Sequence, residues 1–345
     1  MRLGVALGSL VLLGGCTDGM GDARFATPVP LAAVAAVPDA RALLLLRSLP
    51  GGDVSLEYLA EVSAPVQALN LRAEIGRSRI NEGVAGPLLS ADGRWIAMMQ
   101  DGQIVVRRVD GSTVHTIASG DPERLYLLLC GFSPDSATLL YRTGGKDHLE
   151  WGERQAVGRF DLLTLADLTT REVEELGGFR QWFPDSRQVM FVKPGKGDYN
   201  VVAWDVYTGD WRIVQKYMFQ DIFDEPTVHD ALVYVRDTKI VAHELTGGRD
   251  YVRLTEVGQP GQYSRPSFSL DGTRVAYADD QDIRVVALAD PKPETWMTCT
   301  ARCRFDWDSP TTLLVIEGGV LLRVSQGAPA EVITSEVRGF AIAGR

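Results

Sequence analysis

The sequence is poor in the residue types that most often build chemical sites. It has four cysteines and four histidines in 345 residues, and the histidines are scattered along the chain. It contains no G-x-S-x-G, H-E-x-x-H or G-x-x-x-x-G-K-[ST] pattern. These patterns mark a nucleophile elbow, a zinc peptidase helix and a phosphate-binding loop. We therefore expect no catalytic residue, no metal and no cofactor.

Positive charge is scarce as well. The chain has 35 Lys and Arg against 45 Asp and Glu, which gives a formal net charge of −10. An acidic protein is repelled by a phosphate backbone, so we expect no nucleic-acid partner. An anionic membrane surface would also repel it, so membrane attachment must come from another feature.

The N-terminus supplies that feature. Met1 and Arg2 are followed by an apolar run, Leu3–Leu13, which is too short to span a bilayer but is typical of an export signal. The run ends in Gly14-Gly15-Cys16, which resembles the lipobox of bacterial lipoproteins. The resemblance implies cleavage before Cys16 and acylation of its thiol, and acyl chains anchor a domain firmly. The alternative is an ordinary secretory signal with a chance cysteine.

These features divide the chain into three parts. Residues 1–15 are the predicted signal peptide, residues 16–30 the acylated cysteine and a flexible tether, and residues 31–345 the folded domain. In the lipoproteins of enteric bacteria, Asp after the cysteine favours the inner membrane. Thr17 stands there instead. We therefore expect an envelope lipoprotein, anchored at the periplasmic face of the outer membrane.

Three further cysteines remain in a chain expected to reach an oxidising compartment. Cys299 and Cys303 are four positions apart, close enough to join across a tight turn between strands. A disulfide between them would leave Cys130 as a buried thiol. Free thiols are the first alternative. A metal site comes third, because two cysteines without a nearby histidine pair make a poor zinc pattern.

One short pattern, an Asp turn followed by an aliphatic strand, recurs through the domain. Clear copies are LLSADGRWIAM around Asp92, GFSPDSATLLY around Asp135, QWFPDSRQVMF around Asp185 and SFSLDGTRVAY around Asp271. Weaker copies surround Asp39, Asp230 and Asp308. Successive Asp residues are 53, 43, 50, 45, 41 and 37 positions apart. A period of about 40–50 residues is typical of a four-stranded propeller blade.

The other half of each unit is an alternating strand, a polar turn and a second strand. Examples are IVVRRVDGSTVHTIA (104–118), VVAWDVYTGDWRIV (201–214) and GVLLRVSQGAPAEVIT (319–334). Alternation is typical of half-buried strands. We therefore predict an all-β, seven-bladed β-propeller of four-stranded antiparallel blades, with six or eight blades as the alternative. The apolar segment 339–344 is expected to join the first blade and close the ring.

The Asp turn followed by an aliphatic strand resembles the WD40-like repeats of the TolB family, over about residues 35–345. The separate N-terminal domain of that family is missing here, since only the tether precedes the first repeat. The Asp residues of the pattern are interpreted as structural, because a short carboxylate accepts backbone N–H bonds within its own turn.

One connection is longer than its counterparts. Residues 143–158 separate two strands of the third unit, and residues 193–200 occupy the same place in the fourth. Equivalent loops of neighbouring blades lie side by side, and long loops with aromatic residues often carry recognition. The candidate partner-binding residues are therefore His148, Trp151, Lys196 and Tyr199.

These observations favour a non-enzymatic scaffold that binds envelope proteins. The alternatives are a periplasmic lyase or hydrolase, and a sensor that binds a small ligand or metal in the central channel. Fold alone does not distinguish them.

Overall fold

The computed structural model of the chain describes residues 41–49, 54–61, 64–73, 86–117, 125–145, 159–173, 178–194, 198–218, 227–228, 231–236, 239–244, 250–256, 266–300 and 303–343. Every regular element among these residues is a β-strand. None of them belongs to a helix with the length and hydropathy of a membrane span.

The strands form seven four-stranded antiparallel sheets. The closing sheet contains β28 (Val337–Ile342), β1 (Leu43–Ser48), β2 (Val54–Leu59) and β3 (Gln67–Ala73). The next sheet contains β4 (Leu88–Leu89), β5 (Trp95–Gln100), β6 (Gln103–Arg108) and β7 (Val114–Ile117). It is followed by β8 (Leu125–Phe132), β9 (Thr138–Gly145), β10 (Arg159–Thr164) and β11 (Thr170–Val173).

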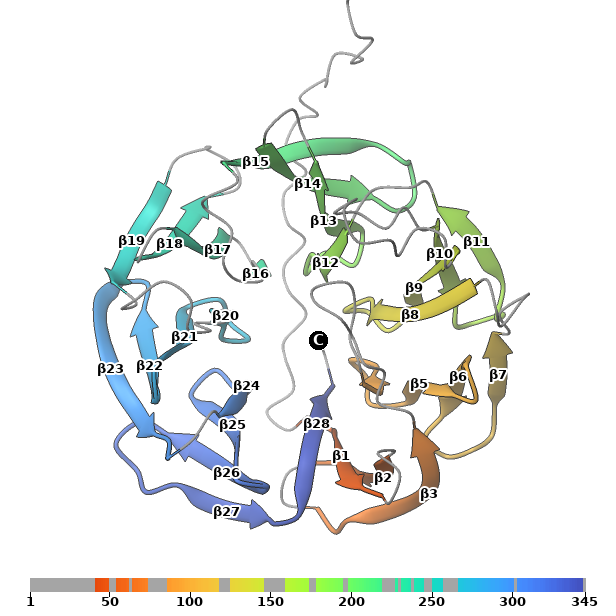
Figure 1. Ribbon diagram of the computed structural model, residues 1–345, viewed down its shortest axis with the longest axis horizontal. Helices are drawn as coiled ribbons and strands as arrows, with labels where there is room; N and C mark the ends of the chain where they lie inside the picture. Colours follow the sequence, from red (N-terminus) through yellow and green to blue (C-terminus); the bar gives the residue numbers. More distant parts are fainter. Residues whose placement is uncertain are drawn as a thin grey trace, which may run out of the picture.

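The remaining four sheets continue around the ring in chain order (Figure 1). One contains β12 (Gly178–Trp182), β13 (Gln188–Pro194), β14 (Asp198–Asp205) and β15 (Trp211–Met218). The next contains β16 (Thr227–Val228), β17 (Ala231–Arg236), β18 (Lys239–Glu244) and β19 (Asp250–Glu256). The last two contain β20 (Ser267–Phe268), β21 (Arg274–Asp279), β22 (Asp282–Ala287) and β23 (Asp290–Thr298), then β24 (Arg304–Ser309), β25 (Thr312–Glu317), β26 (Val320–Ser325) and β27 (Glu331–Thr334).

The ring is closed by strands from opposite ends of the described chain. β28 pairs antiparallel with β1, with Leu43 opposite Ile342 and Leu45 opposite Phe340. Six blades therefore consist of four consecutive strands each, whereas the closing sheet takes its innermost strand from the C-terminal end. Figure 1 shows β28 beside β1 at the inner side of the ring.

The prediction of a seven-bladed propeller is therefore corrected. The architecture is six blades of consecutive strands and one composite closing sheet. Within the described residues, the predicted Asp turn is present in four blades. Asp308 lies inside β24 instead, because that strand runs to Ser309 and the turn follows it. Asp39 and Asp230 lie outside the described residues.

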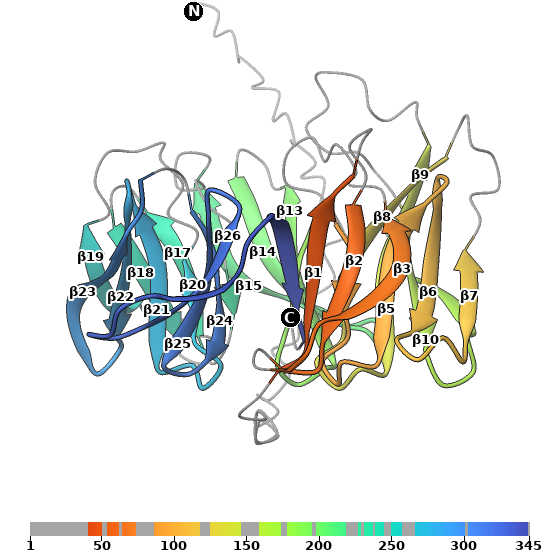
Figure 2. The same ribbon diagram turned by 90° about the horizontal axis from the view of Figure 1, so that it is seen from below.

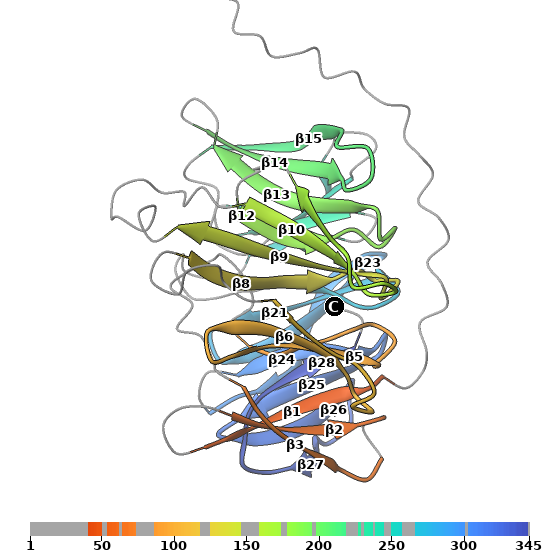
Figure 3. The same cartoon turned by 90° about the vertical axis from the view of Figure 1, so that its right-hand side faces the viewer.

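The core lies between neighbouring sheets, which stack face to face as Figure 3 shows for the β4–β7 and β8–β11 blades. One buried cluster joins those two blades, and another joins the β8–β11 and β12–β15 blades. In the second cluster, the ring of Phe191 packs edge-on against Phe160 at 4.9 Å and Trp204 at 6.1 Å. Radial stacking thus buries both faces of each sheet, which a single sheet cannot do.

The Asp turn is held by its own side chains. In the β4–β7 blade, the Ser90 hydroxyl donates to the Asp92 carboxylate at 2.6 Å and accepts from the Trp95 amide at 2.9 Å. The same carboxylate accepts from the Arg94 amide at 3.0 Å. Equivalent bonds recur in the β8–β11 and β20–β23 blades. The carboxylate is therefore a turn-forming group in these blades.

Neighbouring turns are also joined to each other. The Asp92 amide donates to the Ser136 hydroxyl of the next blade at 2.9 Å, and the Asp135 amide donates to Ser186 at 2.8 Å. Both serines have positive φ angles, 59° and 55°. Gly93 occupies the same turn position in the β4–β7 blade, with a φ of 69°. A serine there would supply the hydroxyl that the other junctions use, but the site has no room for its Cβ.

The turns between first and second strands lie on the same side of the ring as those between third and fourth strands. The Val109 amide donates to the Arg94 carbonyl at 2.8 Å, and equivalent bonds join these two turns in three other blades. We call this side the turn face; it is the lower side in Figure 2. The strand ends at Gly145 and Arg159, which flank the expected long loop of the third unit, lie on the opposite side.

The predicted boundaries of those loops need correction. β9 continues to Gly145, beyond the expected end of the strand near Arg142, and β10 begins at Arg159. Residues 193–200 are not a long loop, because β13 extends to Pro194 and β14 begins at Asp198. Pairing between these strands leaves room for only a short connection.

Candidate functional site

The residues predicted to bind a partner lie mostly outside the described part of the chain. This holds for His148, Trp151 and Lys196, and also for the predicted acylation site Cys16. Tyr199 lies in β14, where its Cα is paired with those of Pro194 and Tyr217. The structure therefore does not show whether the four candidate side chains gather, and the site stays a prediction.

The structure joins Cys299 and Cys303 in a disulfide, with Cα atoms 6.4 Å apart. The bond staples the connection between β23 and β24, on the side opposite the turn face. Cys130 is buried and takes no part in it. Glu317 lies close to both sulfurs, but its carboxylate accepts hydrogen bonds from Thr300. A cysteine ligates a metal as a thiolate, and a disulfide contains no thiolate.

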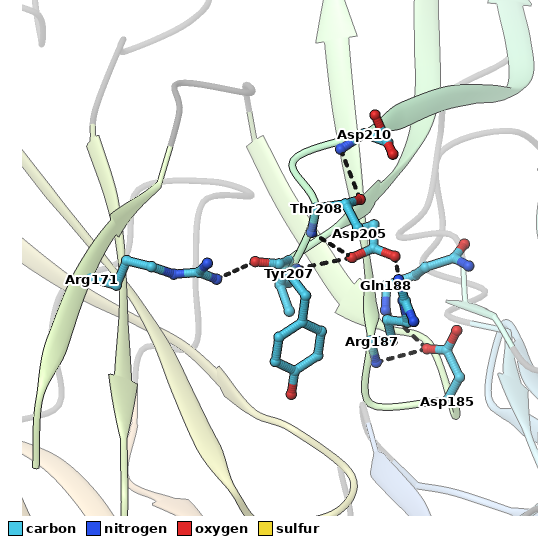
Figure 4. A network of polar contacts seen from close by, with 9 residues as sticks. Arg171, Asp185, Arg187, Gln188, Asp205, Tyr207, Thr208 and Asp210 are labelled. Atoms are coloured by element: carbon cyan, nitrogen blue, oxygen red, sulfur yellow. Dashed lines mark hydrogen bonds and ion pairs between the residues drawn. The ribbon is translucent and has the colours of Figure 1, made fainter. Parts of the chain in front are cut away.

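A polar network on the turn face organises the β12–β15 blade (Figure 4). Its centre is the Asp205 carboxylate, at the end of β14. This carboxylate accepts hydrogen bonds from the amides of Tyr207 at 2.9 Å and Thr208 at 3.0 Å, and it forms an ion pair with Arg187. The Thr208 hydroxyl accepts from the Asp210 amide at 3.2 Å. The turn between β14 and β15 is therefore fixed at several points.

Two further contacts attach this turn to its surroundings. The Asp185 carboxylate accepts from the amides of Arg187 and Gln188, each at 2.9 Å. Here Phe183 replaces the serine of the other turns, so the aspartate accepts both bonds itself. From the neighbouring blade, the Arg171 guanidinium donates to the Val206 carbonyl, as Figure 4 shows. The network thus spans two blades.

The charges in the network remain in place at neutral pH. Burial raises the pKa of Asp205, but hydrogen bonds from Arg187 and from the amides of Thr208 and Tyr207 outweigh it, so the pKa lies below its ordinary value. The hydrogen bond to Asp205 raises the pKa of Arg187. Burial lowers the pKa of Arg212 in the adjoining strand, and Asp185 opposes that shift.

The turn and the start of β15 carry three large side chains that are exposed. Tyr207 is 55% exposed, Trp211 41% and Ile213 38%. Trp211 and Ile213 are two positions apart on β15, so they lie on one face of that outer strand. We call Trp211 and Ile213 the Trp211 patch; Tyr207 lies on the preceding turn, and its ring points away from Asp210 (Figure 4). Large apolar side chains held on a rigid frame favour contact with another molecule.

Sequence reasoning did not identify the Trp211 patch. The segment VVAWDVYTGDWRIV was assigned only as a strand, turn and strand of the repeat. The available signal was the pair of aromatic residues on either side of the Thr-Gly-Asp turn. The equivalent turns at 109–113 and 165–169 have no aromatic residue.

The likeness of this chain to known proteins lies in its fold. No protein-family model and no curated sequence matches it. Porphyromonas gingivalis dipeptidyl peptidase 4 is similar with a TM-score of 0.56 and 13% identity, over 86% of this chain and 51% of that one. The chain thus spans about half the length of that peptidase.

Two further solved structures are similar in the same sense. Oligogalacturonate lyase in complex with manganese has a TM-score of 0.55 and 13% identity, over 79% of this chain and 82% of the lyase. TolB from Acinetobacter baumannii has a TM-score of 0.45 and 14% identity, over 87% of this chain and 82% of TolB. The likenesses to the peptidase and the lyase, whose TM-scores exceed 0.5, show the fold alone, which is a β-propeller.

Proposed function

We propose that this chain is a lipid-anchored β-propeller of the bacterial envelope that binds other envelope proteins without catalysing a reaction. The Trp211 patch carries the proposal, because it is an apolar surface on a blade whose turn is fixed by hydrogen bonds. The anchor is the acylated thiol of Cys16, and the domain faces the periplasm from the outer membrane.

The composition of the patch suits a protein partner. Trp is among the residues that dominate the binding energy of many protein interfaces, since it buries a large area with few rotatable bonds. The network around Asp205 holds the turn before binding, which reduces the ordering cost of association.

Crosslinking in intact cells tests the binding role. The full chain is tagged, and the partner captured by Trp211→Ala/Ile213→Ser is compared with that of the parent. Val332→Ser is the matched control, because Val332 is 65% exposed on β27, the outer strand of another blade. We expect one envelope protein in near-stoichiometric amount from the parent and control, and at least a tenfold loss from the patch variant.

A second variant separates the two candidate surfaces. Deleting residues 146–158, which begin after the observed end of β9, removes the predicted binding residues His148 and Trp151. Loss of the partner only in this variant would move the binding site to the predicted loop. Equal capture by all variants, or no partner at all, would overturn the scaffold proposal.

Replacement of Cys16 tests the anchor. Cys16→Ser removes the thiol that would receive the lipid, so we expect an unprocessed precursor with no label from a radioactive or clickable fatty acid. Normal labelling of this variant would show that Cys16 is not the anchor.

A further inference from the structure

A cavity of about 310 Å³ opens on the turn face between the closing sheet and the β4–β7 blade. Its lining residues are Tyr58, Gln67, Gly93, Arg94, Arg108, Val109 and Asp110. Tyr58 and Gln67 come from the facing ends of β2 and β3, and the other residues from the two turns of the next blade. The volume is at the lower end of the range for small-molecule sites.

Gly93 leaves this junction without the hydroxyl that bridges the next two. At the next two junctions, serine occupies the equivalent turn position and its hydroxyl bonds the preceding blade. A Cβ on Gly93 would lie 2.8 Å from the Ala42 Cβ and 3.3 Å from the Tyr58 hydroxyl oxygen. No side chain fits there, so this junction lacks the serine hydroxyl found at the next two.

Two arginines line this cavity at positions where the β12–β15 blade pairs opposite charges. By strand register, Arg94 and Arg108 occupy the positions of Arg187 and Asp205 in the β12–β15 blade. There the two residues form an ion pair. Here both are cations, so neither neutralises the other.

The acidic neighbours compensate these arginines only weakly. Asp92 approaches the Arg94 Nε at 3.9 Å, and Asp110 approaches the Arg108 Nε at the same distance. Exposed pairs this long contribute little energy. The Arg108 guanidinium also lies 5.3 Å from the centroid of the Trp95 ring, which supports its orientation.

Neutral donors complete the lining. Burial, with a smaller effect of the Asp92 carboxylate, raises the pKa of Tyr58, so its hydroxyl keeps its proton at neutral pH. The Gln67 side chain offers an amide N–H group. Val109, beside Arg108, adds an apolar surface.

We propose that this cavity binds a small ligand bearing a carboxylate, which the guanidinium groups of Arg94 and Arg108 hold from two sides. Arginine recognises carboxylates through paired N–H donors. Asp92 and Asp110 nearby disfavour a dianion, so a carboxylate fits better than a phosphate. The ligand is either a free organic acid or the C-terminal carboxylate of a peptide, and the site is separate from the Trp211 patch.

Titration calorimetry on the full-length chain tests this proposal. The probes are butyrate, butyramide, inorganic phosphate, and a trialanine peptide with a free or an amidated C-terminus. We expect the acids to bind with a Kd on the order of millimolar or tighter. The amides should bind at least tenfold more weakly, and phosphate more weakly than the acids. Tighter binding of butyrate than of the free peptide points to an organic acid, and the reverse order to a peptide C-terminus.

Three variants locate the binding. Arg108→Asp restores the charge pairing seen in the β12–β15 blade, and Arg94→Gln removes a cation whose side chain is 69% exposed and can be lost without harm to folding. Each should weaken carboxylate binding at least tenfold. Arg304→Gln removes an exposed cation from β24, outside the cavity, and should leave the affinity unchanged. Equal affinity of Arg94→Gln and the parent, amides that match the acids, or no binding of any acid would each overturn the proposal.

Discussion

The backbone amide of Asp135 donates a 2.8 Å hydrogen bond to the hydroxyl of Ser186 in the following blade. Ser186 is buried and has a φ of 55°, so a residue that strains its own backbone completes the junction. Hydrogen bonds in a ring of this kind fix each blade against the next, because the stacked apolar faces alone do not determine how two sheets are positioned along each other.

Replacing Ser186 separates the hydroxyl from the backbone strain. Ser186→Ala keeps the strained φ and leaves the Asp135 amide without this acceptor, so we expect a loss of about 1–2 kcal/mol in the free energy of unfolding. Ser186→Gly also removes the hydroxyl but relieves the strain, and should recover up to about 1 kcal/mol of that loss. Urea unfolding measures both. An alanine variant as stable as the parent would show that the bond contributes nothing.

Asp271 should make stability depend on pH. Burial raises its pKa, but hydrogen bonds from the Ser269 hydroxyl and from the Thr273 amide and hydroxyl outweigh it, so the pKa lies below its ordinary value. A depressed carboxyl pKa contributes stability that is present above about pH 4 and is lost as the pH falls through the folded value.

The test compares the parent with Asp271→Asn. Urea titrations give the free energy of unfolding at each pH. Between pH 6 and pH 2 this free energy should fall further for the parent than for the variant, by about 1 kcal/mol or less, since the turn is partly exposed. If the two curves are parallel over this range, the hydrogen bonds of Asp271 do not favour its charged form.

Much of the fold follows from local patterns. The alternating strands and the Asp turns are properties of short segments. The bonds around Ser90 and Asp92 explain why the sequence pattern recurs, because one carboxylate and one hydroxyl satisfy several donors of the same turn. The last apolar strand was predictable for a different reason, because it had no following unit and needed a partner. It pairs with β1.

The features that the sequence did not predict depend on contacts between blades or between strands. Asp308 stands in the letters FDWDSP, which resemble a turn, but it is buried in β24 beside Arg323. The cavity requires Tyr58 to face Arg94 across two sheets, and no spacing in the sequence gives that distance. The Trp211 patch was hidden because its residues also fit the alternation of an ordinary strand.

The disulfide should contribute modestly to stability. Cys299 and Cys303 close a very short loop, and loop-closure entropy then amounts to about 2 kcal/mol. We expect Cys299→Ser/Cys303→Ser to lower the free energy of unfolding by about that amount or less. A reductant should shift the parent toward the variant and leave the variant unchanged. A reductant effect of the same size on both proteins would trace the loss to another cause.

Ring closure depends on a buried cation as well as on β28. The Arg41 guanidinium donates to the Trp307 carbonyl at 3.2 Å, joining the chain before β1 to β24. Asp308, beside Trp307, is 3% exposed, and its carboxylate lies 3.3 Å from the Arg323 guanidinium. Burial raises the pKa of Asp308, and Arg323 and Arg41 only partly counter it. The folded protein therefore binds the proton of the Asp308 carboxyl group more tightly than the unfolded chain does. Stability falls as the pH rises through the folded pKa.

Arg41→Gln removes one of the two cations that compensate this carboxylate, so the penalty for keeping Asp308 charged grows. We expect a loss of about 3 kcal/mol in the free energy of unfolding at pH 7.5, and a smaller loss at pH 4. Adding Asp308→Asn to Arg41→Gln should restore part of the stability, because the double variant no longer buries a carboxylate that has lost one of its two compensating cations. Arg304→Gln, which removes an exposed cation from the same strand, should change stability by no more than about 0.5 kcal/mol. If the double variant is less stable than Arg41→Gln alone, Arg41 stabilises the closure through its bond to the Trp307 carbonyl and not through the charge of Asp308.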